Sequence, residues 1–445
     1  MATKHIPRQS LGHWLPRNRQ VIAKWVKQKV EEAKGSDDEL LPSVRAFQQL
    51  VNCNDDYRRL ANNMFTEASN RYPKDPTGAC AIQSFDEFIN VLNNVVQAGP
   101  EFYDTDDPPT AMGLIGFPIN ALLDWPMGTA SGYGFFLLPE INTSLQSVLN
   151  DWGELLKNHT PQKCLEEWTS QDAQRLLAGS ANIGNTCYTF DQIFLCPDVS
   201  KPFLGFTQWD EFFTRCFKDG IRPIEAPDNA PDLTYPDPTA VIVNACESAP
   251  LQFQTGVKLL DNFWIKEQPY SLVNMLNGNL MAQDFADGSV YQAFLSAKSY
   301  HRWHAPVSGK VVAIEKVPGT YYSENFFEGL AADPDSPDPA APNYSQPYIS
   351  AVATRGIIYI QATNPKIGLM AIVFIGMAEV SSVEFTVNKN DDIVKGDEIG
   401  MFHFGGSSHC MVFRPGVDIR LIHPPPYDID TEKNLAVKSA WAVVA

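Results

Sequence analysis

Two short segments of this chain contain the residue types needed to cut a backbone bond. Residues 405–408 read Gly-Gly-Ser-Ser, and residues 299–306 hold His301 and His304 in an aromatic setting. A neutral imidazole accepts a proton near pH 7, so a histidine held against Ser407 would deprotonate its hydroxyl. The oxygen could then attack the carbonyl of Gly406, which is serine-protease chemistry directed at the chain itself.

A base of this kind needs a carboxylate that holds its imidazole in one tautomer. Glu247 is the candidate, because it follows a strand-like run and precedes a turn. Each pattern also has an ordinary interpretation. Gly-Gly-Ser-Ser is a common tight turn, and the two histidines could simply hydrogen-bond within their domain. His403 and His409 flank the quartet, and we expect them to be packing or pocket residues.

Helical periodicity dominates the N-terminal half, from Val21 to about Phe213. The first predicted helix closes at Gly35-Ser36, and Ser84 with Glu87 forms a capping box at the start of another. The apolar positions recur on single faces: Ile22, Trp25, Val26 and Val30 in one helix, and Leu145, Leu149, Trp152 and Leu156 in a later one. No motif chemistry accompanies these stripes, so we expect this half to be a scaffold that covers a pocket.

After Pro223 the pattern changes to short β-type runs separated by Gly and Pro. The predicted strands are Thr239–Val243, Gly309–Ile314, Gly356–Ala362, Met370–Ile375 and Val383–Val387. We therefore predict an α+β fold, with a helical region over residues 1–205 and a β-rich catalytic domain over 206–445. The proline-rich, acidic stretch 331–347 predicts an extended surface loop, either a mobile lid or an insertion.

Composition excludes several classes of partner. The 445 residues include 34 Lys plus Arg against 52 Asp plus Glu, a formal charge of -18. Such a charge opposes binding to nucleic acid and to anionic lipid surfaces. No apolar stretch is long enough for a signal peptide or a membrane span, so we expect a cytoplasmic protein without integral membrane association. The eight cysteines form no CxxC pair and no Cys/His cluster, so we expect neither a metal site nor a disulfide framework.

Five blocks along the chain together resemble the phosphatidylserine decarboxylase superfamily, and within it the soluble fungal members that decarboxylate tryptophan. The blocks occur in family order: Phe212–Pro223, Val243–Ser248, Tyr300–Pro306, Val373–Met377, and Lys395–Gly400 leading to the Gly-Gly-Ser-Ser quartet. The resemblance covers nearly the whole chain and implies the catalytic domain of that family.

By this resemblance, the chain cleaves itself between Gly406 and Ser407 into residues 1–406 and 407–445, which stay partners, and Ser407 becomes a covalent pyruvoyl cofactor. His304 and Glu247 stand where the family has the His and Asp that drive cleavage, and His301 matches a second histidine implicated in decarboxylation. One departure concerns the carboxylate: the family usually has Asp followed by Gly, whereas this chain has Glu247 and Ser248.

The resemblance also implies a substrate. A pyruvoyl ketone condenses with a substrate amine and accepts the electrons left when CO2 departs, as pyridoxal phosphate does elsewhere. His301 or His304 would protonate the product, and we favour His301. The acidic composition and the likeness to the fungal members indicate a small aromatic L-amino acid. We expect L-tryptophan converted to tryptamine; tyrosine and phenylalanine stay open, as do a phosphatidylserine decarboxylase and an uncleaved member without enzymatic activity.

Overall fold

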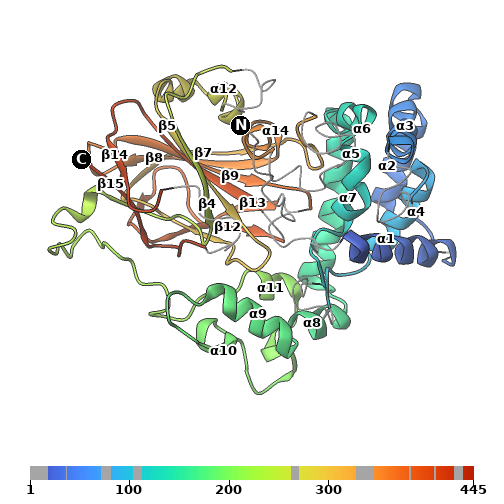
Figure 1. Ribbon diagram of the computed structural model, residues 1–445, viewed down its shortest axis with the longest axis horizontal. Helices are drawn as coiled ribbons and strands as arrows, with labels where there is room; N and C mark the ends of the chain where they lie inside the picture. Colours follow the sequence, from blue (N-terminus) through green and yellow to red (C-terminus); the bar gives the residue numbers. More distant parts are fainter. Residues whose placement is uncertain are drawn as a thin grey trace, which may run out of the picture. The chain divides into compact units, whose positions relative to one another are not determined.

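The structure, a computed structural model, confirms the predicted α+β class (Figure 1). It describes residues 19–36, 38–71, 82–103, 113–261, 270–326, 345–379, 382–404, 407–424 and 434–445. Gly406 and most of the predicted loop 331–347 lie outside the described residues, and for Ser407 only the backbone is described.

The chain divides into two compact units. The first comprises Met1–Ser170, Thr207–Trp209 and Gly319–Ile349, and the second comprises Gln171–Phe206, Asp210–Pro318 and Ser350–Ala445. Residues 171–205 therefore group with the β-rich part, although the sequence placed them before the predicted boundary. All predicted site residues belong to the second unit.

The first unit is helical because apolar residues recur at helical spacing and are buried. Its helices are α1 Arg19–Lys34, α2 Pro42–Asn52, α3 Asp55–Arg71, α4 Phe85–Val95, α5 Pro118–Met127, α6 Ala130–Phe136, α7 Pro139–Asn158 and α8 Gln162–Trp168, with a hairpin of β1 Glu101–Tyr103 and β2 Gly113–Ile115. The predicted face of α1 is confirmed, since Trp25, Val26 and Val30 are buried. The Ser84 hydroxyl accepts the Glu87 N–H at 3.2 Å, which caps α4 as expected.

The second unit is built on a seven-stranded antiparallel sheet with the strand order β11-β7-β8-β9-β13-β5-β4. Its strands are β4 Ala249–Thr255, β5 Ser289–Leu295, β7 Gly309–Val317, β8 Arg355–Ala362, β9 Leu369–Gly376, β11 Asp392–Ile393 and β13 Ser407–Phe413. The predicted strands at 309, 356 and 370 are thereby confirmed as β7, β8 and β9.

Two three-stranded sheets and short helices complete this unit. One sheet has the order β10-β12-β6 (β6 Arg302–His304, β10 Ser382–Phe385, β12 Glu398–His403), and the other has the order β14-β15-β3 (β3 Val241–Val243, β14 Ile419–Leu421, β15 Ala440–Val444). The helices before them are α9 Gln171–Ala181, α10 Phe190–Ile193 and α11 Trp209–Phe213.

Strand β6 is oriented by its tryptophan. The Trp303 ring stacks on Phe374 of β9, with ring centroids 3.7 Å apart and an interplanar angle of 5°. Side chains alternate along a strand, so Arg302 and His304 point away from the large sheet. The His304 N–H donates to the Ala245 carbonyl at 2.8 Å, which ties β6 to the segment that carries Glu247.

Candidate active site

Strand β13 fixes the backbone of the predicted cleavage site. Ser407 pairs with Gly376 of β9 on one side and with Leu295 of β5 on the other. The next residue, Ser408, is buried, and its hydroxyl accepts a hydrogen bond from Gln292 Nε2 at 3.2 Å. The Tyr270 hydroxyl in turn donates to Gln292 Oε1 at 2.6 Å. A buried polar chain therefore holds the residue that follows Ser407.

The imidazole of His304 is held at both nitrogens. Nδ1 lies 2.9 Å from the Gly396 carbonyl and Nε2 lies 3.0 Å from the Tyr300 hydroxyl. A carbonyl can only accept, so Nδ1 carries the proton and Tyr300 donates to Nε2. Burial, and then the nearby charge of Lys438, lower the pKa of His304 to about 3. The imidazole is therefore neutral at pH 7, with its basic nitrogen toward Tyr300.

A tight turn delivers the Gly396 carbonyl. Gly396 has φ +90, and a Cβ there would lie 2.5 Å from Ile224 Cδ1, so the turn requires glycine. The Gly396 N–H donates to the Ala305 carbonyl at 2.8 Å. Lys395 is buried and its ammonium lies 2.7 Å from Asp228. These contacts hold the turn against the end of β6.

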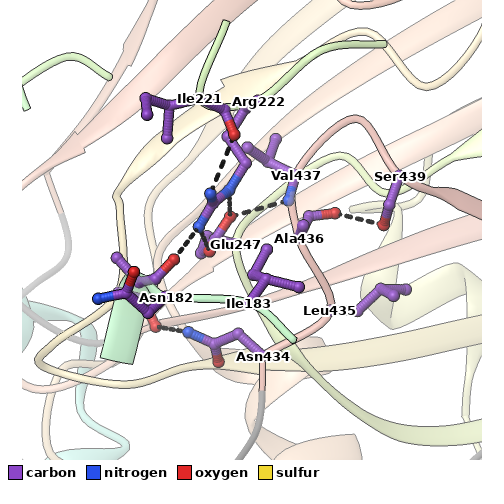
Figure 2. A network of polar contacts seen from close by, with 12 residues as sticks. Asn182, Ile183, Ile221, Arg222, Glu247, Asn434, Leu435, Ala436, Val437 and Ser439 are labelled. Atoms are coloured by element: carbon purple, nitrogen blue, oxygen red, sulfur yellow. Dashed lines mark hydrogen bonds and ion pairs between the residues drawn. The ribbon is translucent and has the colours of Figure 1, made fainter. Parts of the chain in front are cut away.

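Glu247 does not make the hydrogen bond that the sequence analysis expected of it. Its carboxylate binds the Arg222 guanidinium, with Nε at 3.0 Å and Nη2 at 2.5 Å, and accepts the Val437 N–H at 2.9 Å (Figure 2). Glu247 is only 1% exposed, and these three donors occupy both of its oxygens. The tautomer of His304 is set by the Gly396 carbonyl instead, because that carbonyl occupies the Nδ1 side of the ring.

A column of side chains nevertheless connects Glu247 with His304. The Arg222 guanidinium carbon lies 4.4 Å from the centre of the Phe217 ring, a cation–π contact. Phe217 stacks on Tyr300 with centroids 4.4 Å apart, and Tyr300 donates to His304. Glu247 therefore touches the base only through three intervening side chains.

A cavity of about 350 Å³ lies beside the ion pair. Its walls are mostly apolar and include Ile183, Tyr188, Ile193, Ile221, Arg222 and Val437. Arg222 also donates to the carbonyls of Ile221 at 3.2 Å and Ala181 at 2.7 Å. Each of its three nitrogens is therefore already bonded, so the guanidinium serves the ion pair and the fold rather than the cavity.

His301 lies against the strand that leads to the cleavage segment. Its carbonyl accepts the Phe402 N–H at 3.0 Å. Its ring stacks on Phe213 with centroids 4.2 Å apart, and Phe213 is 6.1 Å from the ring of Phe404, which directly precedes Gly405. Burial, and then the charge of Arg215, hold the pKa of His301 well below its usual range. Both predicted histidines are therefore neutral, in separate surroundings.

The histidines that flank the quartet differ from each other. His403 has one ring nitrogen 3.0 Å from Asp210 and the other 2.8 Å from Glu384, so it bridges two carboxylates. His409 is fully buried, and neither of its ring nitrogens has a hydrogen-bond partner within the described ranges. Burial lowers the pKa of His409 to about 3. Its position on β13 is two residues from Ser407, the interval at which strand positions share a face.

Phe217, Arg222 and Tyr300 also belong to this site, although none of them was predicted to be a site residue. All three lie inside the motif blocks that carried the family resemblance, so their occurrence there was the available signal. Gly396 also lies inside such a block, Lys395–Gly400, but the block did not indicate that the Gly396 carbonyl would bind His304, because backbone groups are present at every residue.

The described ranges contain no metal cluster, no disulfide and no membrane-spanning helix. There, no group of three or more His, Cys, Asp or Glu side chains is arranged to hold a metal ion, and the seven cysteines that the structure describes are free thiols. Among the described helices, none combines the length and the apolar character needed to cross a bilayer.

Comparison with known proteins gives consistent matches. The family model described as phosphatidylserine decarboxylase matches residues 209–425, and a second model with that description matches residues 41–177. Decarboxylase iboD of Amanita muscaria is 35% identical over 80% of this chain and 99% of its own length. L-Tryptophan decarboxylase of Psilocybe cubensis is 33% identical over 75% of this chain and 73% of its own length. Phosphatidylserine decarboxylase proenzyme 3 of Schizosaccharomyces pombe is 28% identical over 49% of this chain and 20% of its own length.

Proposed function

Because the chain belongs to the phosphatidylserine decarboxylase family, we propose that it is a pyruvoyl-dependent decarboxylase of an aromatic L-amino acid, with L-tryptophan and tryptamine as substrate and product. The names of the fungal relatives support an amino-acid substrate. The observation that carries the chemistry is His304, a neutral imidazole with a defined tautomer in the same unit as Ser407.

Self-cleavage is the first reaction in this proposal. His304 Nε2 takes the Ser407 hydroxyl proton, and the oxygen attacks the Gly406 carbonyl, so that the amide becomes an ester. Loss of the Cα proton of residue 407 then breaks the ester C–O bond on the Ser407 side, which leaves a carboxylate on Gly406 and dehydroalanine at position 407. This enamine tautomerises to an imine, and water hydrolyses the imine to the pyruvoyl ketone and ammonia. Tyr300 donates to His304 Nε2, so we place its hydroxyl in the path of the Ser407 hydroxyl proton.

The surroundings of residue 407 suit a pyruvoyl group. Position 407 begins a central strand that is paired on both sides, and Gly376 opposite it has no side chain to obstruct the group. When present, the group supplies a ketone that binds the substrate amine and accepts electrons as CO2 leaves. His301 keeps one N–H while neutral, and in this proposal it supplies the proton to the product carbon.

The two chains should remain associated after cleavage. Residues 407–413 pair with β9 and β5, and β15 pairs with β3. Val437 donates to Glu247, and the Ala440 N–H donates to Glu225 at 2.8 Å. Because these contacts cross the proposed cut, the small chain should separate only on denaturation.

Mass analysis tests the proposed cleavage. Under denaturing conditions we expect two chains that part after Gly406, the smaller one blocked to N-terminal sequencing, and a single complex under native conditions. Ser407→Ala should remain one inert chain, whereas Ser408→Ala, a matched control at the next residue, should still be cut. An intact chain in active wild-type protein would contradict the pyruvoyl mechanism.

A panel of candidate substrates tests the proposed substrate specificity. CO2 release would be measured with tryptophan, tyrosine, phenylalanine and vesicles of phosphatidylserine in separate reactions. We expect turnover of tryptophan above the other amino acids. Turnover of the lipid alone would replace this proposal with a phosphatidylserine decarboxylase, the activity in the family's description.

A further inference from the structure

Arg215 is a buried cation that has no counter-ion among the described residues. It is 5% exposed, and its guanidinium carbon lies among three phenylalanine rings, 4.4 Å from the centre of Phe194, 5.3 Å from Phe212 and 5.6 Å from Phe190. Nη1 donates to the Phe212 carbonyl at 3.2 Å, while Nε and Nη2 have no hydrogen-bond partner in the part of the chain that the structure describes. Within the described part of the chain, no aspartate or glutamate forms an ion pair with it.

Burying a guanidinium with two unsatisfied nitrogens is energetically unfavourable unless a further group accepts their hydrogen bonds. A buried charge is normally paired, and each unsatisfied donor is costly. The aromatic rings offset part of that cost through cation–π contacts. Burial lowers the pKa of Arg215 to about 10, so the group is still a cation at neutral pH.

The fold can satisfy a buried arginine where no ligand is required. Arg355 is 3% exposed, and its three nitrogens donate to the carbonyls of Met275, Ala353 and Asn274 at 2.6 to 2.8 Å. Unlike Arg355, Arg215 makes no hydrogen bond to a described residue along one edge of its guanidinium. The edge without hydrogen-bond partners among the described residues consists of Nε and Nη2, whose two parallel N–H directions match a carboxylate.

Arg222 shows what that edge does in this same protein. There Nε and Nη2 hold the two oxygens of Glu247. In Arg215 the equivalent edge has no partner among the described residues. The charge of Arg215 also lowers the pKa of His301, whose ring stacks on Phe213. The empty edge therefore lies in the surroundings of the histidine assigned to product protonation.

We propose that Arg215 is a carboxylate-binding residue of the active site, with Nε and Nη2 receiving the two oxygens of one carboxylate. This inference rests on the proposed function, which offers two sources of that group. One is the α-carboxylate of the amino-acid substrate. The other is the new C-terminal carboxylate that self-cleavage leaves on Gly406.

The test compares Arg215→Lys with Arg355→Lys, because both keep the charge and remove the planar edge from an equally buried site. Two competitive inhibitors probe the cleaved enzyme: indole-3-propionate, which has a carboxylate and no amine, and tryptamine, which has an amine and no carboxylate. Cleavage is followed separately as the rate at which the small chain appears after synthesis.

If the substrate is the source, Arg215→Lys should weaken inhibition by indole-3-propionate at least about tenfold and leave inhibition by tryptamine unchanged. If the Gly406 terminus is the source, the same variant should slow cleavage at least about tenfold and leave both inhibitors unchanged. Arg355→Lys should do neither. Normal cleavage and normal inhibition in Arg215→Lys would overturn the proposal while leaving the proposed function standing.

Failure of the proposed function is distinguished by calorimetry. If wild-type protein is never cleaved, binding of indole-3-propionate to the intact chain is titrated directly. Binding that is lost in Arg215→Lys and kept in Arg355→Lys would support the carboxylate site without the decarboxylase. Absence of binding to the intact wild-type chain would overturn it.

Discussion

Arg222 and Arg215 lie on the same short stretch of chain, and both guanidinium groups rest on phenylalanine rings. Around Arg222 every polar group is paired: Glu247 fills the Nε and Nη2 edge and also accepts the Val437 N–H. In Arg215 the same edge has no hydrogen-bond partner in the described part of the chain. A saturated cluster can hold a fold in place, whereas an unsaturated one has capacity left for a ligand.

The difference predicts opposite responses to mutation. Where polar groups are paired, removing one leaves its partner buried and unsatisfied, which lowers the free energy of unfolding. Where a buried group has no partner among the described residues, as for His409, removing it leaves no other polar group unsatisfied. It also removes the free-energy cost of burying that group. The following three changes test this contrast.

The largest effect is expected in the paired cluster. Glu247→Gln removes the counter-ion of a guanidinium whose side chain is only 7% exposed, so we expect the free energy of unfolding to fall by about 3 to 5 kcal/mol. Urea unfolding of the uncleaved Ser407→Ala chain measures it. Glu398→Gln, which breaks the more exposed pair with Arg302, should cost about 1 kcal/mol or less. Equal losses in the two variants would contradict the contrast.

An intermediate effect on the free energy of unfolding is expected when the pH is lowered. His304 and His409 both have pKa values of about 3 when folded, against about 6.5 unfolded. The unfolded chain therefore binds more protons between these values, so stability is full above pH 6.5 and is lost as pH falls toward 3. At pH 5 each histidine should cost about 2 kcal/mol.

His409→Leu isolates the unpaired group. It should keep or raise stability at pH 7 and reduce the loss between pH 7 and pH 5 by about 2 kcal/mol. Urea midpoints at the two pH values give the comparison. An unchanged acid response, or a large loss at pH 7, would show that His409 is satisfied in solution.

The smallest effect is expected from a single hydroxyl. Tyr300→Phe removes the donor to His304 Nε2 and should cost about 1 kcal/mol of stability. Because that bond favours the neutral imidazole, its loss should raise the pKa of His304. Charged neighbours of the ring are Lys438 and Arg302, which lower this pKa, and Glu398, which pairs with Arg302.

Two measurements check this variant. The acid limb of the self-cleavage rate should move to higher pH, and cleavage at pH 7 should slow about tenfold as the base loses its anchor. Tyr359→Phe is the matched control, since this buried hydroxyl has no hydrogen-bond partner among the residues described. A shift of the same size in both variants would remove Tyr300 from the machinery.

Local pattern was sufficient for most of the fold. The apolar faces of α1 and α7 and the strands β7, β8 and β9 were predicted from periodicity, because burial on one face or on both leaves a repeat in the sequence. The order of the seven strands was not predictable, since β13 pairs with β5 and β9, which lie far from it in the sequence. The motif blocks correctly indicated the family.

The sequence by itself determined which residue types are available for chemistry: a serine after glycine, two histidines, a glutamate and the arginines of the Phe212–Pro223 block. Only the tertiary structure decided their partners. In the folded chain Glu247 binds Arg222, and the imidazole of His304 donates to a backbone carbonyl. Arg215 has two guanidinium nitrogens without a partner among the described residues. The physical reason is that pairing depends on distances of a few ångströms between segments far apart in the chain, and on backbone groups that every residue possesses.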